Sequence, residues 1–386
     1  MRVLVAGAGI SGLAVARGLV ADGHEVVVLE GADGLRLGGG AITLWCNGTA
    51  ILGDLGVDLA GTGQRLSTLS LRTARGRRIT EVDLESLTAR FGSAPRVIPR
   101  GSLIKLLAAG LPDGSVRFGA RVRDLETDRD GVRVRTATGA EYEADLLVGA
   151  DGVRSRVRAL ALGDGPAATT GLAIWQGLTP APFDPGPTTT LMIGRQADAG
   201  FMSAGDGLMQ WFFELPWSPA DPPARKPVEM LRRRFAGWGA PVARVLDSLS
   251  DGDVELFPHT RHRVPRRWGA GRCVLLGDAV HAMPPVGAHG TNQALEDVAA
   301  LTACLRAAPA PDAVVDTVVD TVVDAYSARR RRRAARASAV AANTLAASGP
   351  RALMQSEPVM RLMAAVPPRL AAPGFAGLLR ALSDRI

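Results

Sequence analysis

Val3-Leu4-Val5-Ala6-Gly7-Ala8-Gly9-Ile10-Ser11-Gly12 opens the chain and decides its fold. The apolar run up to Ala6 predicts a buried strand, the glycines predict a tight loop, and the apolar residues through Val20 predict a helix. Gly7 permits the turn, Gly9 lets a phosphate approach the backbone, and Gly12 lets the helix pack closely against the strand. The helix N-terminus at Ile10 and Ser11 supplies amide donors. The segment therefore predicts a dinucleotide-binding βαβ unit.

Glu30 ends the second strand of this unit, predicted over Val26 to Leu29, 18 residues after Gly12. A carboxylate at this place accepts hydrogen bonds from an adenosine ribose and repels a 2′-phosphate. The site therefore favours FAD or NAD over NADP. The alternative is an ordinary surface glutamate at the end of a strand.

Bulk composition limits the other classes of protein. The 386 residues are 47% hydrophobic, enough for a large core in two or three domains. No window approaches the roughly 18 apolar residues of a membrane span, and Met1-Arg2 leads directly into the first strand, so we expect no signal peptide and a cytoplasmic location. Cys46, Cys273 and Cys304 are widely spaced and predict reduced thiols, with neither a disulfide framework nor a metal site.

Arginine accounts for most of the net charge of +7. The densest run, Arg329 to Arg333, follows an apolar-periodic stretch (314–326) and precedes an Ala-rich one (334–347), so we place it on a long helix. It lacks interleaved aromatic residues, so we interpret it as a solvated face and expect no nucleic-acid partner. The Val-Val-Asp repeat within 314–324 predicts a packing helix, and the apolar tail (350–386) predicts core cover ahead of a dimer or membrane surface.

Two later stretches repeat the pattern of a buried strand that ends in a carboxylate. Leu146 to Val148 lead to Asp151-Gly152, with basic residues behind the turn that can face phosphate. Val274 to Leu276 lead to Gly277-Asp278, where Asp278 is placed to hold a sugar or ribityl hydroxyl. Between them, residues 166–265 change to short alternating segments, which predict antiparallel sheet.

Three strand-end sites in this order resemble the class A flavin-dependent monooxygenases, with the para-hydroxybenzoate hydroxylase fold, over residues 1 to about 345. The match is closest in Pro284-Pro285-Val286-Gly287-Ala288-His289-Gly290-Thr291-Asn292, and the stretches 39–48 and 235–238 look more like urate hydroxylase and zeaxanthin epoxidase relatives. The resemblance implies an α/β fold in which a discontinuous Rossmann-like FAD-binding domain carries an inserted antiparallel-sheet substrate domain and a C-terminal helical segment. The implied FAD-binding segments are 1–70, 100–165 and 266–305, those of the substrate domain are 71–99 and 166–265, and the helices occupy 306–386.

The resemblance also implies roles for single residues. Asp151 touches FAD and the incoming nicotinamide cofactor, Arg100 binds FAD, and Val122 contacts the adenine through its backbone. Gly290, Thr291 and Asn292 open a helix whose amides face the pyrimidine edge of the flavin. Arg36 takes a basic position before the flavin-facing loop, with helix-end solvation as the alternative.

Pro285 and His289 are the candidate catalytic positions beside the flavin. A cationic His289 would favour reduced flavin and act as an acid or base, and a plain hydrogen-bonding role is the alternative. We interpret His281 as structural. His259 and His262 lack a third ligand nearby, so we expect surface or strand packing and no metal.

Two departures from the family pattern concern the ring and the substrate. The chain has Trp45-Cys46-Asn47-Gly48 where relatives often have Trp-Pro-Asn-Gly, which we expect to loosen this loop. It has Trp175-Gln176-Gly177 where relatives have Trp-Arg-Gly, which removes a positive charge and disfavours an anionic substrate.

By this resemblance the chain binds FAD, is reduced transiently by NADPH or NADH, and uses O2 through a flavin C4a-hydroperoxide to hydroxylate or epoxidise a small aromatic or polycyclic substrate. The basic charge favours NADPH without assigning an arginine to its 2′-phosphate. The alternatives are a flavin oxidase or reductase of the same fold and a non-catalytic flavin-binding module. We expect a monomer or homodimer.

Overall fold

The computed structural model describes residues 1–128, 131–308, 315–345, 359, 362 and 365–386. Its first sheet has six strands in the order β18-β19-β12-β1-β2-β8, and β18 alone runs antiparallel to its neighbour. The inner strands are apolar along their whole length because both faces of the sheet are covered. In sheet order the strands are Gly269–Ala270, Cys273–Leu275, Leu146–Gly149, Arg2–Ala6, Glu25–Leu29 and Val116–Arg117.

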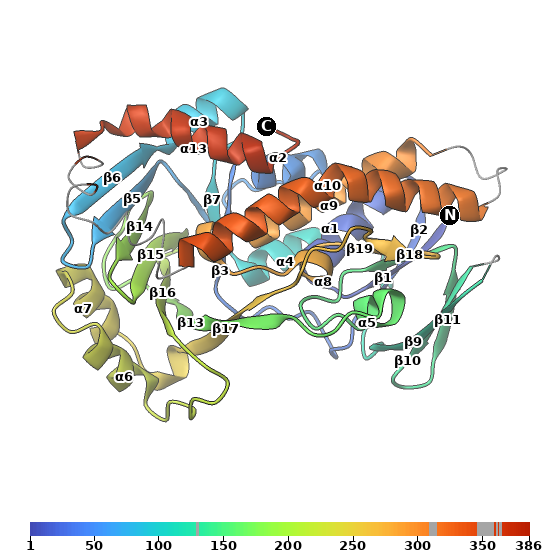
Figure 1. Cartoon of the computed structure of the whole chain (residues 1–386), viewed down its shortest axis with the longest axis horizontal. Coiled ribbons are helices and arrows are strands. Elements are labelled where there is room, and N and C mark those ends of the chain that lie inside the picture. Colours follow the sequence, from blue (N-terminus) through green and yellow to red (C-terminus); the bar gives the residue numbers. More distant parts are fainter. Residues whose placement is uncertain (129–130, 309–314, 346–358, 360–361, 363–364) are drawn as a thin grey trace.

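Helices and a small sheet pack around these parallel strands. Helix α1 contacts both α4 and α9, and the three-stranded sheet β11-β10-β9 contributes Val132 and Val134 to the same core (Figure 1). The helix bounds are Ile10–Ala21 for α1, Arg100–Ala108 for α4, Arg156–Leu162 for α5, Asp278–His281 for α8 and His289–Arg306 for α9. The small sheet comprises Val122–Thr127 (β9), Val132–Thr136 (β10) and Glu141–Ala144 (β11).

A second large sheet has seven strands in the order β17-β13-β16-β15-β14-β5-β6, antiparallel except for the pair β14 and β5. It confirms the predicted antiparallel texture between 166 and 265 and adds two strands from earlier in the chain. The strands are Glu255–Arg261 (β17), Ala168–Pro180 (β13), Leu208–Pro216 (β16), Asp198–Gly205 (β15), Thr188–Ile193 (β14), Thr68–Thr73 (β5) and Arg78–Asp83 (β6). The mixed α/β architecture is as expected, whereas the exact domain boundaries stay a prediction.

The two faces of this sheet have different neighbours. Trp175, Trp211 and Phe213 point to one face, where they pack with helices α6 (Pro227–Arg234) and α7 (Ala240–Asp247). The other face packs with Trp45, α3 (Leu84–Phe91) and α13 (Pro368–Leu382). A third sheet, β3-β7-β4, consists of Ala41–Leu44, Arg96–Pro99 and Gln64–Arg65. Helix α2 (Cys46–Asp54) follows β3 and contacts α9.

The C-terminal part covers the core. Helix α10 (Val315–Leu345) lies along α9, buries Val319, Val322 and Val323, and exposes Asp320 and Asp324, as the repeat predicts. The side chains of residues 314–318 lie outside the described part of the chain. Helix α13 buries Ala372, Ala376 and Leu379 against β6 and α3, so this part of the tail covers the core.

Two further findings concern membranes and thiols. None of the described helices is long and apolar enough to cross a membrane. Cys46 and Cys273 are buried, Cys304 is half-buried, and all three are free thiols.

Candidate functional site

Four parallel strands end side by side at one edge of the first sheet, in the order β19, β12, β1 and β2. The residues that follow them are the predicted binding residues: Gly277-Asp278 after β19, Asp151 after β12, Gly7 to Gly12 after β1, and Glu30 after β2. Ligands of open α/β sheets bind at the carboxyl ends of the strands. The fold therefore brings the three separate sequence motifs to one edge.

The glycine loop shows why each glycine is needed. Gly7 has φ +101°, and a Cβ there would lie 2.6 Å from the carbonyl oxygen of Ala150. A Cβ at Gly12 would lie 1.9 Å from the carbonyl oxygen of Gly7, whereas a Cβ at Gly9 would meet nothing within 4 Å. The first and third glycines thus allow close backbone packing, and the second borders open space. The amides of Ile10, Ser11 and Gly12 head α1 without an intrahelical acceptor.

Glu30 is buried and braces this loop. Its carboxylate accepts the amide of Ala8 at 2.8 Å and the amide of Ala32 at 2.9 Å. The guanidinium of Arg36 lies 3.6 Å away. The alternative of a plain surface glutamate is therefore wrong.

The Gly277-Asp278 turn lies against the glycine loop. A Cβ at Gly277, which has φ +61°, would lie 2.7 Å from the hydroxyl oxygen of Ser11. The side chain of Asp278 keeps accessible surface, yet the protein around it removes bulk water and raises the pKa of its carboxyl. The Asp278 side chain is therefore reachable from outside, and its surroundings disfavour the ionised form.

Asp151 is half-buried, and its carboxylate accepts hydrogen bonds from the first residues of the following helix, α5. It accepts the Ser155 hydroxyl at 2.5 Å and the amides of Arg156 and Val157 at 2.7 and 3.1 Å. Burial nevertheless raises the pKa of its carboxyl, and the Ser155 hydrogen bond offsets part of that effect. Arg158, behind this turn, is buried and donates to the carbonyls of Ala279 and Val280, so it does not face a phosphate but supports α8.

Arg36 lies in the loop after β2, and Arg100 contacts this loop from α4. Nη1 of Arg100 donates to the carbonyls of Arg36 and Gly38 at 2.7 and 3.2 Å. Burial lowers the pKa of Arg100, and nearby Arg36 adds to this effect. Arg36 lies in this loop and not at a helix end, which excludes helix-end solvation. Val122 buries its side chain in the core at the start of β9.

The stretch from Pro285 to Asn292 forms a sharp turn that leads into α9. Gly287 and Ala288 both have positive φ, +71° and +55°, and Gly287 is exposed. The Asn292 carboxamide accepts the Trp45 amide at 2.9 Å and donates to the carbonyls of Thr43 and Ala288. Its side chain therefore holds the Trp45 loop, which is the connection between β3 and α2. The indole of Trp45 donates to the carbonyl of Gly287 at 2.8 Å. These contacts pin the loop that the Cys46 substitution was expected to loosen.

His289 is buried at the first position of α9. Burial lowers its pKa to about 4. Its ring is therefore neutral at pH 7, which disfavours the cationic role and leaves the hydrogen-bonding role open.

Three further histidines, His259, His262 and His281, are buried. His281 is fully buried, and its Nε2 lies 2.5 Å from Asp297. His262 contacts the carbonyl of Val153 at 2.9 Å. His259 is fully buried within β17, so a surface position is wrong for it, and burial lowers its pKa to about 4. No group of three or more metal-ligating side chains occurs among the described residues.

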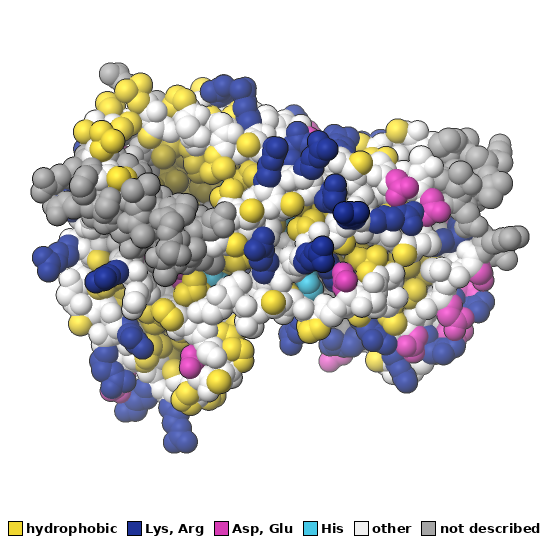
Figure 2. Space-filling model, in the orientation of Figure 1, with side chains coloured by type: hydrophobic (Ala, Val, Ile, Leu, Met, Phe, Trp, Pro, Cys, Tyr) yellow, Lys and Arg dark blue, Asp and Glu magenta, His cyan; other side chains and the backbone are white. Residues whose placement is uncertain are grey.

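Sequence reasoning was wrong about part of the basic run. Figure 2 shows basic side chains along α10, and Arg329 is indeed 46% exposed, but Arg330 is fully buried. Arg330 donates to Asp297 at 2.9 Å and to the Gln293 carboxamide at 2.7 Å. A run of like charges on a helix gives no sign that one member turns inward. Only the Glu296-Asp297 pair on α9 hinted at a buried partner.

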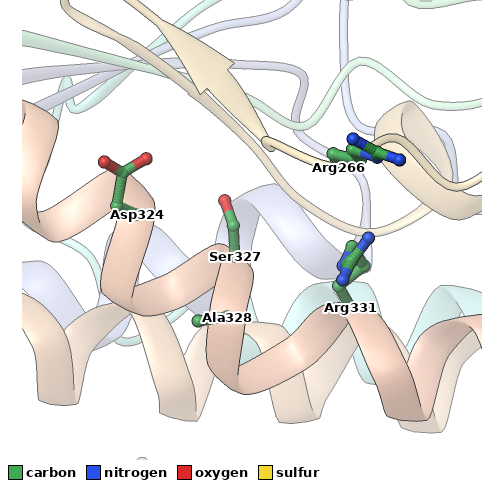
Figure 3. Close-up of a pocket in the computed structure, with 5 residues that line it drawn as sticks. All are labelled: Arg266, Asp324, Ser327, Ala328 and Arg331. Atoms are coloured by element: carbon green, nitrogen blue, oxygen red, sulfur yellow. The ribbon is translucent and has the colours of Figure 1, made fainter.

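Gln210 also escaped the sequence reasoning. It lies on β16 of the second sheet and accepts the Ala41 amide at 2.6 Å, which ties that sheet to the first residue of β3. A separate pocket of about 370 Å³ is lined by none of the residues of the three motifs (Figure 3). Arg266 and Arg331 line it with Asp324, which is paired to Arg267, and Ser327, which already bonds Trp268 and Val323. It is not the site assembled by the motifs.

Comparison with known proteins supports the same interpretation. A family described as FAD binding domain matches residues 1–341. Aurachin C monooxygenase/isomerase of Stigmatella aurantiaca is 33% identical over 311 residues, 79% of this chain and 80% of that protein. FAD-dependent urate hydroxylase of Klebsiella pneumoniae is 32% identical over 320 residues, 79% of this chain and 82% of that protein.

Solved structures agree over nearly the whole chain. Klebsiella pneumoniae HpxO complexed with FAD and uric acid superposes with a TM-score of 0.88 at 28% identity, covering 99% of this chain and 97% of that one. A salicylate hydroxylase substrate complex, at 21% identity, shows the same fold with a TM-score of 0.78, covering 100% of this chain and 98% of that one.

Proposed function

The chain belongs to the FAD-binding domain family, among relatives that are flavin monooxygenases, and from this premise we propose that it hydroxylates or epoxidises a small, uncharged aromatic or polycyclic compound. One observation carries the proposal: four strand ends bring an adenosine-type carboxylate, an open glycine loop and an accessible, desolvated Asp278 to a single edge.

The residues present fit FAD. The open space beside Gly9 and the amides of Ile10, Ser11 and Gly12 suit a pyrophosphate, which needs close backbone approach and hydrogen-bond donors. Glu30 suits the adenosine ribose, and Asp278 suits sugar or ribityl hydroxyls. We assign Arg36, Arg100, Val122, Asp151, Gly290, Thr291 and Asn292 to the same cofactor, the last through the backbone because its side chain holds the Trp45 loop.

When bound and reduced by NADH or NADPH, FAD supplies the chemistry with oxygen. The protein positions the ring and excludes water. The N-terminus of α9 offers the amides of Gly290 and Thr291 and a positive dipole end, which stabilise negative charge near them. Pro285 lies in the turn before this helix, and we assign to neutral His289, at the first position of α9, a hydrogen-bonding role without a net charge.

The substrate class follows from the sheet face that meets Ala41 at the start of β3. Alternation along β13 and β16 places Gln176, Leu178 and Phe212 on the same face as Gln210, which contacts Ala41. Leu178 and Phe212 are only partly buried, and Gln176 is uncharged. Such a face suits a flat neutral molecule and offers no cation to a carboxylate.

The deciding experiment measures NADH and NADPH oxidation by the FAD-loaded protein, with peroxide release and product analysis, over paired aromatic substrates that differ only in a carboxylate. We expect neutral members to stimulate oxidation with little peroxide and with one oxygen atom added to the product. Gln176→Arg should move the preference toward the carboxylated member. Turnover without oxygen would instead identify a reductase, and oxygen consumed with matching peroxide and no oxygen atom in the product would identify an oxidase. A protein that stays colourless with FAD would refute the proposal.

Four further expectations belong to this proposal. O2 is the co-substrate, the location is cytoplasmic, the protein is a monomer or homodimer, and the FAD-binding and substrate domains divide at the boundaries given above. Light scattering of the purified protein tests the oligomeric state, and limited proteolysis tests the boundaries.

A further inference from the structure

We propose that Arg330 and the C-terminal residues Ser383 and Asp384 are positioning residues for the cofactor site, acting through the adjacent carboxylates Glu296 and Asp297 on α9. The inference rests on the proposed function, because it concerns how the same FAD site is held. It assigns a role to the basic run and to the tail, neither of which the site itself uses.

Asp297 connects Arg330 to the Gly277-Asp278 turn. One of its oxygens accepts the amide of Gly277 at 2.9 Å and lies 2.5 Å from Nε2 of His281. The other accepts Nε of Arg330 at 2.9 Å. All three side chains are fully buried. Since Gly277 immediately precedes Asp278, the position of Asp297 sets the turn that carries Asp278.

Glu296 connects Arg330 to the start of α2, which directly follows the Trp45 loop. One of its oxygens accepts the Asn47 carboxamide at 3.0 Å and the hydroxyl of Ser383. The other accepts the Asp384 amide at 3.1 Å and lies 3.8 Å from Arg330. Arg330 is therefore the common cation of two carboxylates, each of which holds a different segment of the site.

The tail completes this arrangement. The carboxylate of Asp384 lies 3.6 Å from Arg329 and 3.8 Å from Arg330, and it pairs with Arg333. Gln293 donates to the carbonyl of Leu382 at 2.7 Å. Two turns earlier, Phe375 of α13 packs edge-on against Trp45 at 5.0 Å between ring centroids. Residues beyond the family match, which ends at 341, thus contact Trp45 directly and connect to the Gly277 turn through Arg330 and Asp297.

A purely stabilising role explains this cluster poorly. Buried ion pairs lose hydration that their attraction barely repays, and well-packed apolar side chains often stabilise as well. Here the carboxylate oxygens are used on Gly277, in the turn before α8, and on Asn47, at the start of α2 directly after the Trp45 loop. A positioning role explains both why these charges are buried and why the carboxylates contact these two segments of the site.

The test compares FAD affinity with fold stability. The double variant Asp297→Asn/Arg330→Met keeps the net charge and removes the central ion pair, and Ser383→Ala removes one tail contact. Arg385→Ala is the matched control, because Arg385 neighbours the same tail but pairs with exposed Asp54. FAD dissociation constants come from flavin fluorescence at a temperature well below unfolding, and unfolding of the FAD-free protein is followed by circular dichroism.

We expect the double variant to raise the FAD dissociation constant about fivefold or more and Ser383→Ala to raise it about threefold, with Arg385→Ala unchanged, because charge-assisted contacts are roughly twice as strong as neutral ones. Folded variants with wild-type affinity would overturn the inference alone. If the double variant does not fold, equal affinities for Ser383→Ala and Arg385→Ala overturn it. A wild-type chain that binds no FAD would instead overturn the proposed function on which it rests.

Discussion

The glycine loop (7–12) and the stretch from Gly277 to Asn292 adjoin each other at one sheet edge but are built by different means. The glycine loop depends on close backbone packing, of Gly12 on Gly7 and of Gly7 on Ala150, and on one carboxylate, Glu30. The later stretch depends on side chains from Trp45, Asp297 and Arg330. The first is held mainly by backbone contacts that only glycine permits, and the second by side-chain contacts across the chain.

This difference predicts different failures. A change in the glycine loop acts sterically and at once, because the atoms that it meets are backbone and cannot move aside. A change in the later stretch acts through charge and hydrogen bonding, so it alters pH dependence and affinity more than folding. The following experiments, in order of decreasing effect, test whether the contrast holds.

The largest effect is expected from Gly12→Ala. Its new methyl would lie 1.9 Å from the Gly7 carbonyl oxygen, so α1 cannot keep its place on the sheet. We expect a loss of about 4 kcal/mol or more of unfolding free energy, measured by urea denaturation. Gly9→Ala is the control, since the same methyl meets nothing within 4 Å. It should fold normally yet weaken FAD binding at least about tenfold. Equal stability of the two variants would show that the loop is not held by backbone contact.

Asp278→Asn should separate affinity from stability. The variant loses a charged acceptor for cofactor hydroxyls, so FAD binding should weaken about 10- to 100-fold by titration. The pKa of Asp278 is raised in the folded protein, so the ionised carboxyl destabilises the FAD-free fold above that pKa. The FAD-free variant should therefore unfold at a higher temperature than wild type near pH 7, and the gap should close as the pH falls toward 3.8. A variant that is less stable than wild type at pH 7 would contradict the raised pKa of Asp278.

The contrast also explains what could be predicted from sequence. The glycine spacing, Glu30 and the strand-end carboxylates are short-range patterns, and the parallel sheet then brings them together. The burial of Arg330 was not predictable, because its acceptors lie 33 residues away or more and its neighbours in the run are exposed. The choice between a cationic and a plain hydrogen-bonding His289 stayed open for a similar reason. The pKa of this histidine depends on burial, which a motif does not report.

His289 should affect turnover modestly and without a pH signature near neutrality. With a pKa of about 4 its ring stays neutral between pH 5.5 and 8, so it should add no limb to the kcat profile there. His289→Ala should lower kcat about two- to tenfold, the value of one hydrogen bond, with FAD content unchanged. A wild-type limb near pH 6.5 that His289→Gln abolishes would restore the cationic role.

The same shift predicts a stability effect. A histidine whose pKa falls from 6.5 to about 4 on folding stabilises the native state above pH 6.5, and this stabilisation is lost as the pH falls toward 4. Wild type should therefore lose more unfolding free energy than His289→Gln between pH 7 and 4.5. His259 has a similar shift in both proteins, so the difference between them isolates His289.

Ala288→Gly should have the smallest effect on stability and tests whether the later stretch holds useful strain. Ala288 has φ +55°, which costs an alanine roughly 1 kcal/mol. Glycine relieves this cost but loses about 0.5 to 1 kcal/mol to the flexibility of the unfolded chain, so the unfolding free energy should change by less than about 1 kcal/mol. Asp206→Gly is the matched control, because exposed Asp206 has φ +52° in the β15–β16 turn. If the turn before α9 must be rigid, Ala288→Gly alone should increase peroxide release per NAD(P)H oxidised. Equal coupling in both variants would mean that the strain at Ala288 only lets the turn fit between Pro285 and Asn292.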